Sequence, residues 1–550
     1  MRGGTTKQSS LTSYCQVGLL CCARNDATHI RMCRIGLLIA LIFSFLGGFA
    51  QQAETSRFEV SRWSKNQSCQ FVSFQDKGGM MVYETDKTDE DKNRLWNFVA
   101  LDTSLYEQRS DLIPLPDKLK LFDAKSSAQW AAFVFTYEKA SRSDSVTFYV
   151  VTFHRLEQTF TTFSGQLPER SLLQSVALLD GTLMLSVNSK SGGGFLEQYD
   201  LSHHTQRTIT PNLNNDFILF QFEAIPDARV FVLAAREFVE KRYKATSFMV
   251  YSPSGNLLQS HRFENGENAG LGRMCFALDD QQQLTVYATL ERESNKKVSV
   301  EGMTEDFSKI AVGVTWIKFA SGGMQTKTYL FKNLPEIENA LTASDRLKVK
   351  EELLKMKQGK KKEKGEITFQ FYAPRLVKFG SNQVFVAEAF QPVFHTETRV
   401  DHSYYGFYST YPMNYTVFDG YDFFSEILLA FDQNGELKWY NSVRFENDLC
   451  ETLSDHASES VCHNELVVAS PSRNILRYEV FDTDGKTLLN QQFAPLDLLY
   501  GTDSYEDEYY ACIYKWFGSR FLIHGCQIVQ NPLLRDTRRT VFYVQKVQYE

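Results

Sequence analysis

The chain has 550 residues, 43% of them hydrophobic and 23% charged, so it is globular in composition and long enough for one large repeat fold or two to three ordinary domains. Its net charge of -7 excludes nucleic acid as an electrostatically favoured partner, because phosphate contacts require a basic face. Aromatic residues reach 14%, which favours β-strands, where flat and bulky side chains pack well on a pleated surface.

The first predicted element is a secretory signal peptide that ends at Ala50. Arg31 and Arg34 precede an apolar run over residues 35–46, and small residues follow this run. A basic start, a short apolar stretch and a small-residue end are typical of an export signal that is cleaved. The run is short for a membrane span, which needs about 20 apolar residues. An uncleaved membrane anchor over residues 35–50 stays open as the alternative.

We assign residues 1–50 to this signal, with Met32 as an alternative start. Export would place the mature chain in an oxidising compartment, where disulfides can form. The cysteine pairs closest in sequence are the disulfide candidates, and each could staple a hairpin or a loop: Cys450 with Cys462, and Cys512 with Cys526. Buried free thiols are the alternative. The cysteine and histidine spacing indicates no metal site, and we expect no cofactor.

A turn pattern recurs along the body of the chain, which we divide into residues 51–334 and 367–550. Three segments share an aromatic residue, Asp or Ser, two further residues and Gly: "YSPSGNLLQSHRF" (251–263), "FDQNGELKWYNSV" (431–443) and "FDTDGKTLLNQQF" (481–493). Asp or Ser followed by Gly three residues later fits a type I turn that closes a hairpin with a bulge. Each copy therefore predicts strand, tight turn and strand.

A second type of hairpin alternates with the first, with a short polar turn between two apolar runs. These turns fall near residues 77, 181, 227, 381 and 518, with further candidates near 126 and 281. Two hairpins in a unit of about fifty residues give four antiparallel strands, which is typical of a propeller blade. The sequence therefore predicts an all-β fold, a β-propeller of seven to eight four-stranded blades, with a pair of β-sandwiches as the alternative. Near-continuous apolar runs such as Val384–Ala389 are expected to be inner strands buried on both faces.

Residues 335–366 break the strand pattern and predict a Lys-rich helical insertion between blades. Leu347, Leu353 and Leu354 lie on one broad side of this helix, and Thr342 with Asp345 resembles a capping box. The basic run at its end could contact a partner or an anionic surface, although a solvated insertion explains it more simply.

An aromatic segment over residues 390–424 shows no clean strand period, and we interpret it as a binding loop on a rigid scaffold. Its candidate ligand-binding residues are Tyr404, Tyr405, Phe407, Tyr408 and Tyr411. Packing of the loop on the rim of the blades is the alternative.

An acidic segment over residues 500–510 supplies three further candidates for ligand binding, Asp503, Glu506 and Asp507. Clustered carboxylates could bind Ca²⁺, but the spacing of a calcium loop is missing, so a solvated acidic loop is the simpler interpretation.

The stretch "EILLAFDQNGELKWYNSV" resembles the turn and following Trp of quinoprotein-like propeller repeats, in which D-x-x-G-x-x-x-W closes a blade. The other two copies carry Gln259 or Leu489 in place of the Trp, so they match in part. The order of segments along the chain is similar to that of exported proteins of Bacteroidota. The resemblance implies a propeller with WD40-like blades, in which Trp439 packs between blades, and it carries over neither an activity nor a quinone cofactor.

Motifs for catalysis are weak. The hydrolase elbow G-x-S-x-G, the zinc motif H-E-x-x-H and the P-loop are missing from the sequence. His402 and His456 each follow an Asp, which could form half of an acid–base relay, but polar loops place such pairs together by chance.

These observations predict an exported, non-enzymatic β-propeller that acts as a binding or scaffold module in the periplasm or cell envelope. Its expected partner is a protein or another envelope component, bound through the loops over residues 395–424 and 500–510. A carbohydrate-active hydrolase or lyase using the central funnel is the first alternative, and a membrane-tethered sensor domain is the second. An enzyme would bring His and carboxylate groups with shifted pKa values together at the funnel.

Overall fold

The computed structural model describes residues 56–61, 68–137, 145–189, 193–266, 269–293, 309–357, 366–401, 411–451 and 453–549. The predicted signal peptide, with the possible anchor over residues 35–50, lies outside these residues. In the described part of the chain, no helix combines the length and apolar character needed to cross a membrane.

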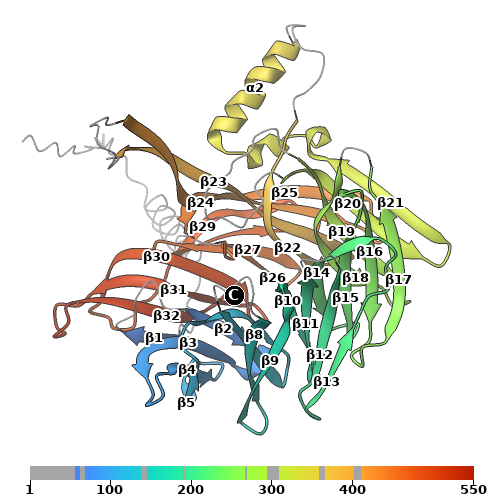
Figure 1. Cartoon of the computed structure of the whole chain (residues 1–550). Coiled ribbons are helices and arrows are strands. Elements are labelled where there is room, and N and C mark those ends of the chain that lie inside the picture. Colours follow the sequence, from blue (N-terminus) through green and yellow to red (C-terminus); the bar gives the residue numbers. More distant parts are fainter. Residues whose placement is uncertain are drawn as a thin grey trace, which may run out of the picture. The chain divides into compact units, whose positions relative to one another are not determined.

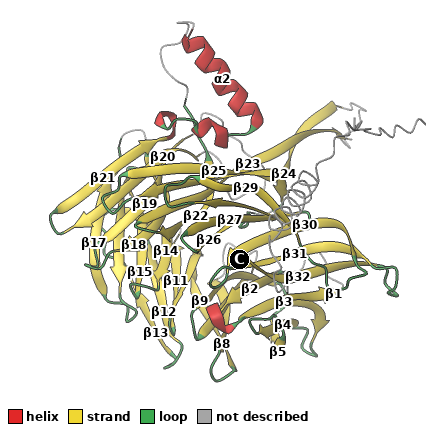
Figure 2. Ribbon diagram, turned by 180° about the vertical axis from the view of Figure 1, so that it is seen from behind, coloured by secondary structure: helices red, strands yellow, loops and turns green. Residues whose placement is uncertain are grey.

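The described strands form eight antiparallel sheets of four strands each, which confirms the predicted propeller and sets the blade count at the upper end of the expectation (Figures 1 and 2). Blades 1 to 4 comprise β2 (Cys69–Ser73), β3 (Gly79–Thr88), β4 (Arg94–Leu101) and β5 (Glu107–Leu115); β6 (Leu119–Ser126), β7 (Trp130–Tyr137), β8 (Ser145–His154) and β9 (Thr159–Glu169); β10 (Ser171–Leu179), β11 (Thr182–Ser189), β12 (Gly194–Asp200) and β13 (Thr205–Ile209); and β14 (Asp216–Ile225), β15 (Val230–Val239), β16 (Arg242–Tyr251) and β17 (Leu257–Glu264). Blades 5 to 8 comprise β18 (Gly270–Leu278), β19 (Leu284–Glu293), β20 (Lys309–Ala320) and β21 (Gly323–Leu330); β22 (Gln370–Phe379), β23 (Asn382–Asp401), β24 (Tyr411–Phe431) and β25 (Leu437–Cys450); β26 (Ser458–Cys462), β27 (Glu465–Ser472), β28 (Ile475–Phe481) and β29 (Thr487–Pro495); and β30 (Ser504–Lys515), β31 (Arg520–Gln530) and β32 (Arg538–Gln548) with β1 (Ser56–Ser61).

Blade 8 combines both ends of the described chain. Strand β1 pairs with β32 in antiparallel register, from Ser56 opposite Lys546 to Ser61 opposite Val541. The N-terminal strand is therefore the outermost strand of the last blade, and it covers an edge that β32 would otherwise expose to solvent.

The hydrophobic core consists of eight separate layers, each between two successive blades of the described structure. Every layer takes apolar side chains from both neighbours, and the layer of Phe71, Met81, Trp516 and Phe542 joins blade 8 to blade 1. The ring is thus closed by packing as well as by the pairing of β1 with β32. Because burial is the largest favourable contribution to folding, each blade depends on both of its neighbours for stability.

Second strands of the blades carry runs that are buried on both faces, and so do third strands such as β16. Val384–Ala389 lies in β23, and all of its side chains are buried. The run is therefore an inner strand buried on both faces, as expected, and it is the second strand of its blade. First strands such as β2, β6 and β30 border the central cavity, whereas β23 lies between two blades. Fourth strands such as β5 and β17 alternate between exposed and half-buried positions.

The repeated turn connects the third and fourth strands of a blade. After β24, the backbone N–H of Gly435 donates to the Asp432 carbonyl (2.9 Å), and the Asp432 carboxylate accepts from the N–H groups of Asn434 and Glu436 (both 2.9 Å). Gly435 has a φ of 74°, which glycine adopts without steric cost. This is the turn chemistry that the sequence pattern predicts.

The same turn also contacts the preceding blade. A Cβ atom added to Gly435 would lie 2.2 Å from the Trp316 ring, and one added to Gly485 would lie 2.4 Å from the Trp439 ring. The Trp439 indole donates its Nε1–H to the carbonyl of Thr483 (2.9 Å). Trp439 is therefore packed between blades 6 and 7, and glycine is needed in these turns for close approach as well as for its φ.

The segment between blades 5 and 6 contains helices and leaves the propeller body (Figure 1). It comprises the 3-10 helices η2 (Phe331–Asn333) and η3 (Ile337–Ala340) and the helix α2 (Ala343–Lys357), while η1 (Gln75–Lys77) lies in blade 1. The Thr342 hydroxyl accepts from the Asp345 N–H (3.3 Å), so Thr342 caps the helix N-terminus. Leu347 and Leu354 are exposed, whereas Val349 packs into the layer between blades 5 and 6.

Candidate functional site

The aromatic segment over residues 390–424 forms a β-ribbon and not the irregular loop expected from the sequence. Strands β23 and β24 contain 20 and 21 residues, whereas the other described strands contain between 5 and 14. Their pairing continues from the blade out to Asp401 opposite Tyr411. Both ribbon views show this end of the pair projecting from the blade (Figures 1 and 2). We call residues 394–418 the arm.

Aromatic rings pack along the base of the arm, which explains why the sequence lacks a clean alternation. The ring centroids of Phe394 and Phe418 are 5.5 Å apart, and those of Phe418 and Tyr421 are 4.9 Å apart. Further out, the His395 ring lies between two carboxylates, Asp419 (2.5 Å) and Glu397 (3.3 Å). These hydrogen bonds raise the pKa of His395.

Four of the predicted aromatic contact residues fall within residues 402–410, outside the described part of the chain: Tyr404, Tyr405, Phe407 and Tyr408. The fifth, Tyr411, is the first residue of β24. His402 also falls outside the described residues. The role of these candidates in binding therefore stays a prediction.

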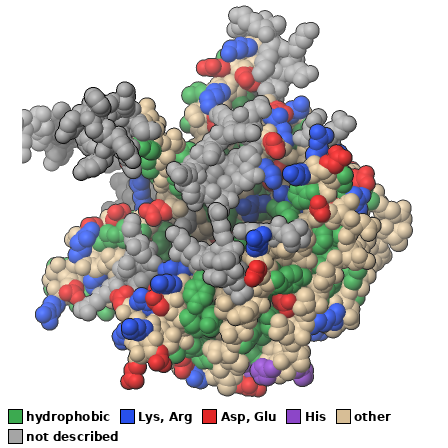
Figure 3. Space-filling model, in the orientation of Figure 1, with side chains coloured by type: hydrophobic (Ala, Val, Ile, Leu, Met, Phe, Trp, Pro, Cys, Tyr) green, Lys and Arg blue, Asp and Glu red, His purple; other side chains and the backbone are tan. Residues whose placement is uncertain are grey.

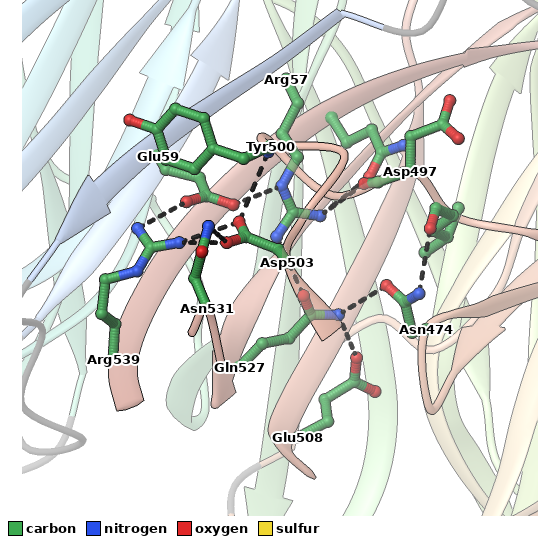
Figure 4. A network of polar contacts seen from close by, with 12 residues as sticks. Arg57, Glu59, Asn474, Asp497, Tyr500, Asp503, Glu508, Gln527, Asn531 and Arg539 are labelled. Atoms are coloured by element: carbon green, nitrogen blue, oxygen red, sulfur yellow. Dashed lines mark hydrogen bonds and ion pairs between the residues drawn. The ribbon is translucent and has the colours of Figure 1, made fainter. Parts of the chain in front are cut away.

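The acidic segment does not gather its carboxylates at one point. Asp503 is buried, and both of its oxygens accept from Arg539 Nη2 (3.0 and 2.8 Å), as Figure 4 shows. Glu506 forms an exposed ion pair with Arg538 (2.9 Å), and Asp507 is exposed. The first two candidates are therefore held by arginines of β32, and the three carboxylates do not converge on a cation site.

Asp503 instead belongs to a network that fixes the closing strand. Arg57 of β1 donates to Glu59 (2.7 Å) and to the side-chain oxygens of Gln527 (2.9 Å) and Gln545 (3.1 Å). Arg539 lies between Glu59 and Asp503 (Figure 4). Buried charges require such partners, so the network ties the N-terminal strand to β31, to β32 and to the residue that precedes β30.

The expected disulfides are not formed in the structure, where all six described cysteines are free. In the register of β30 and β31, Cys512 lies opposite His524 and Cys526 lies opposite Tyr510, so the two thiols occupy diagonal positions. Burial raises the pKa of both thiols to about 12, which keeps them protonated and unreactive near neutral pH.

A cavity of about 750 Å³ lies at the centre of the ring, bordered by β2, β6, β22 and β30. A second cavity of about 550 Å³ is bordered by β14, β18 and β22 on the other side of Leu453, which borders both. Lysine and arginine side chains gather around the central hollow on the face shown in Figure 3. Volumes of this size are typical of sites for small ligands.

Asp455 borders the first cavity, and the adjacent His456 does not. Burial raises the pKa of the Asp455 carboxyl, and the charges of Arg375 and, to a smaller extent, Lys125 oppose this change. The His456 ring is buried against Phe423 with centroids 4.0 Å apart, and burial lowers its pKa to about 4. Neighbouring residues in extended backbone point in opposite directions, so this Asp–His pair does not form the acid–base relay considered from the sequence.

A buried cluster of charged groups lies between blades 6 and 7. The Arg375 guanidinium donates to Glu459 (2.7 Å), Glu426 (2.8 Å) and Glu388 (3.1 Å), and Glu388 also accepts from the His456 backbone N–H (2.9 Å). Burial raises the pKa of Glu388 to about 8 and also raises the pKa of Glu426, where the Glu459 carboxylate adds to the effect. At Glu459, burial acts in the same direction, but the charge of Arg375 and the hydrogen bonds with Glu426 and Arg375 together outweigh it and lower the pKa.

This cluster could not be predicted from the sequence, because its members come from four separate strands. The single local signal is Glu388, a charged residue inside the apolar run Val384–Ala389. A carboxyl group at a fully buried strand position requires a partner elsewhere. Within the described residues, no group of three or more His, Cys, Asp or Glu side chains is arranged to hold a metal ion.

No family model matches the chain, and no curated protein matches it. Among solved structures, it is similar to a prolyl endopeptidase (10% identity, 85% of this chain and 54% of that one, TM-score 0.37). It is also similar to the β-propeller domain of the Trilobed protease from Pyrococcus furiosus (9%, 75% and 95%, TM-score 0.33) and to the WD40 domain of SCAP from fission yeast (8%, 90% and 98%, TM-score 0.30). The chain thus spans about half the length of the prolyl endopeptidase, and the eight sheets themselves are what establish the propeller.

Proposed function

We propose that the protein is an exported, non-enzymatic propeller that binds a protein or another component of the bacterial cell envelope. The arm is the observation that carries this proposal. It extends a blade by pairing β23 with β24 far beyond the strands that surround them. An extension of this kind adds no layer to the core, so contact with a partner is the role that suits it best.

The composition of the arm suits a protein surface. Tyr415 is 39% exposed, and the segment between the two strands carries the Tyr and Phe residues predicted to bind. Tyrosine supplies a large contact area at low cost in conformational entropy, and aromatic residues are enriched where binding energy concentrates. The eight blades hold the base of the arm in place, which reduces the entropy lost on binding.

Shortening the arm tests the proposal. Val393 pairs with Gly420, so residues 394–419 can be replaced by an Asn-Gly turn, which favours a two-residue hairpin. A photoreactive phenylalanine analogue at Tyr415, in intact cells, should cross-link one envelope protein or component. The same analogue at Leu156, exposed in a turn of blade 2, is the control.

We expect the shortened variant to keep the thermal unfolding temperature of the full chain within a few degrees, and to lose this partner in co-purification. Equal cross-linking from positions 415 and 156, or co-purification that survives the deletion, would count against the proposal.

Export is tested separately by sequencing the N-terminus of the mature protein. A first residue near Gln51 agrees with a cleaved signal. Retention of residues 35–50 in a membrane fraction supports the tethered sensor instead.

An enzyme of the carbohydrate-active class is the second candidate, because Asp455 borders the central cavity with a raised pKa. A carboxyl group that keeps its proton can act as a general acid toward a glycosidic oxygen. Release of reducing ends from polysaccharides by the purified protein, lost in Asp455→Asn, would favour this function over the scaffold.

A further inference from the structure

A polar groove of about 620 Å³ lies between the helical insertion and the outer strands of blades 6 and 7, away from the arm tip and the central cavities. Its walls come from the segment before α2, from α2 itself, from β25 and from the turn region of β28 and β29. Most of its lining side chains are amides, hydroxyls or charged groups, and the largest ring among them is Tyr440. The volume fits a ligand the size of a short oligosaccharide.

Two arginines face each other in this groove without a carboxylate partner. The Arg444 guanidinium donates to the backbone carbonyl of Asn339 (Nε to O, 2.9 Å), which is a neutral acceptor. Burial lowers the pKa of Arg444, and the positive charge of Arg346 lowers it further. Among the described residues, neither arginine forms an ion pair with a carboxylate. Glu336 also borders the groove, but it lies near Tyr440, whose pKa is raised by burial and then by this charge.

Glu479 supplies the complementary group at the other wall. Glu479 is 7% exposed and lines the groove. Its carboxyl oxygens are not among the fully buried, unpaired side-chain atoms of the described residues, so they can accept hydrogen bonds from a ligand in the groove. Burial alone raises the pKa of Glu479, to about 7. The groove therefore offers one hydrogen-bond acceptor, the Glu479 carboxyl group. It also offers two guanidinium groups, of Arg346 and Arg444, that no described carboxylate neutralises.

The strand opposite Glu479 is irregular at this point. The pairing of β28 with β29 shifts register between Tyr478 and Val480, and Gln491 has a φ of 45°, an unusual conformation for a residue with a side chain. The shift places Asn490 and Gln491 on the wall of the groove. Backbone outliers held by surrounding structure concentrate at binding sites.

We propose that this groove binds a short acidic sugar, a uronic-acid oligosaccharide. The carboxylate of a sugar residue would accept from Arg346 and Arg444, since guanidinium groups bind carboxylates in a planar, bidentate way. Sugar hydroxyls would donate to Glu479 and exchange hydrogen bonds with Asn490 and Gln491. A peptide is less well suited, because the lining offers no deep apolar pocket for its side chains.

Calorimetric titration of the full mature chain tests the site. The probes are trigalacturonate, the neutral trisaccharide maltotriose and inorganic phosphate. We expect trigalacturonate to bind at least ten times more tightly than either of the others, because it alone offers both the carboxylate and the hydroxyls.

Two variants and one control locate the binding. Arg346→Gln should weaken trigalacturonate binding about tenfold or more, and Glu479→Leu should also weaken it, because the hydroxyls lose their acceptor. Lys350→Gln removes a positive charge from the same helix outside the groove and should change the affinity less than twofold.

Three results would overturn the proposal: no heat of binding with trigalacturonate at 10 mM, phosphate binding as tight as trigalacturonate binding, or equal effects of Arg346→Gln and Lys350→Gln. A thermal unfolding temperature in each variant that is no lower than that of the parent chain shows that a loss of binding is not a loss of fold.

Discussion

The sequence is most informative about individual turn residues. Asp432 and Gly435 are spaced for a type I turn with a left-handed glycine, and the backbone adopts it. Asp482 and Gly485 do the same fifty residues later. Such residues act on their own backbone within four positions, so their role follows from local sequence alone.

Charged residues behave differently, because their partners are distant in sequence. Asp503 was a candidate ligand residue by its acidic neighbours, but its partner is Arg539, 36 residues away. Arg375 and Glu459 are 84 residues apart. A stretch of sequence shows which charges exist but not which of them the fold neutralises, so it predicted neither the Asp503–Arg539 ion pair nor the buried cluster.

Glu479 makes stability depend on pH. Because burial raises its pKa from 4.5 to about 7, the folded state binds this proton more tightly than the unfolded state. Its contribution to the free energy of unfolding is therefore fully present below pH 4.5. This contribution, up to about 3 kcal/mol, is lost as the pH rises to about 7. Glu479→Gln should therefore flatten the fall in unfolding free energy across this window in urea denaturation.

The control for this measurement is Glu240→Gln, a substitution at an exposed turn. It should leave the pH dependence of the full chain unchanged. If Glu479→Gln also leaves it unchanged, the carboxyl group is solvated in the folded protein.

At the level of whole elements, hairpins were predictable and the arm was not. The predicted turns fall between the first and second, or the third and fourth, strands of blades, because polar turn residues interrupt apolar runs. The arm shows no such contrast between polar turn residues and apolar runs in its sequence. Its aromatic residues occupy both faces of a ribbon, so residues 390–424 show no alternation even though β23 and β24 pair regularly.

Replacing Gly485 tests how much this turn contributes to packing against the neighbouring blade. Gly485→Ala places a Cβ 2.4 Å from the Trp439 ring at a φ of 77°. We expect a loss of about 2–4 kcal/mol in unfolding free energy, from left-handed backbone strain and overpacking together. Gly501→Ala is the matched control, because nothing lies within 4 Å of the added atom. Similar stabilities for the two variants would mean that the turn is not locked between blades.

For the whole molecule, the repeat spacing predicted seven to eight blades, and the structure has eight. The pairing of β1 with β32, which closes the ring, could not be predicted from the sequence. Strand β1 has no turn that links it to β32, so neither periodicity nor turn chemistry identifies its partner.

Removing the closing strand tests its role. A chain that begins after Ser61 exposes the edge of β32 and removes Arg57 and Glu59 from the buried network. Exposed strand edges pair with other chains, so we expect this variant to form dimers or larger species in size-exclusion chromatography with light scattering. A chain that begins at Gln51 is the control and should match the full mature protein. A monomeric, equally stable truncated chain would show that β1 is dispensable.

The closing strand also has a consequence for the time course of folding. Arg57 and Gln545, which bond across it, are 488 residues apart in sequence. Contacts of such separation form slowly, because a long loop must be ordered before they are made. The N-terminal strand is synthesised first and finds its place last, so the newly made chain carries an unpaired strand until the final blade is complete. If the chain is exported as an unfolded polypeptide, that interval falls on the far side of the membrane, where we expect a chaperone to protect β1 until β32 arrives.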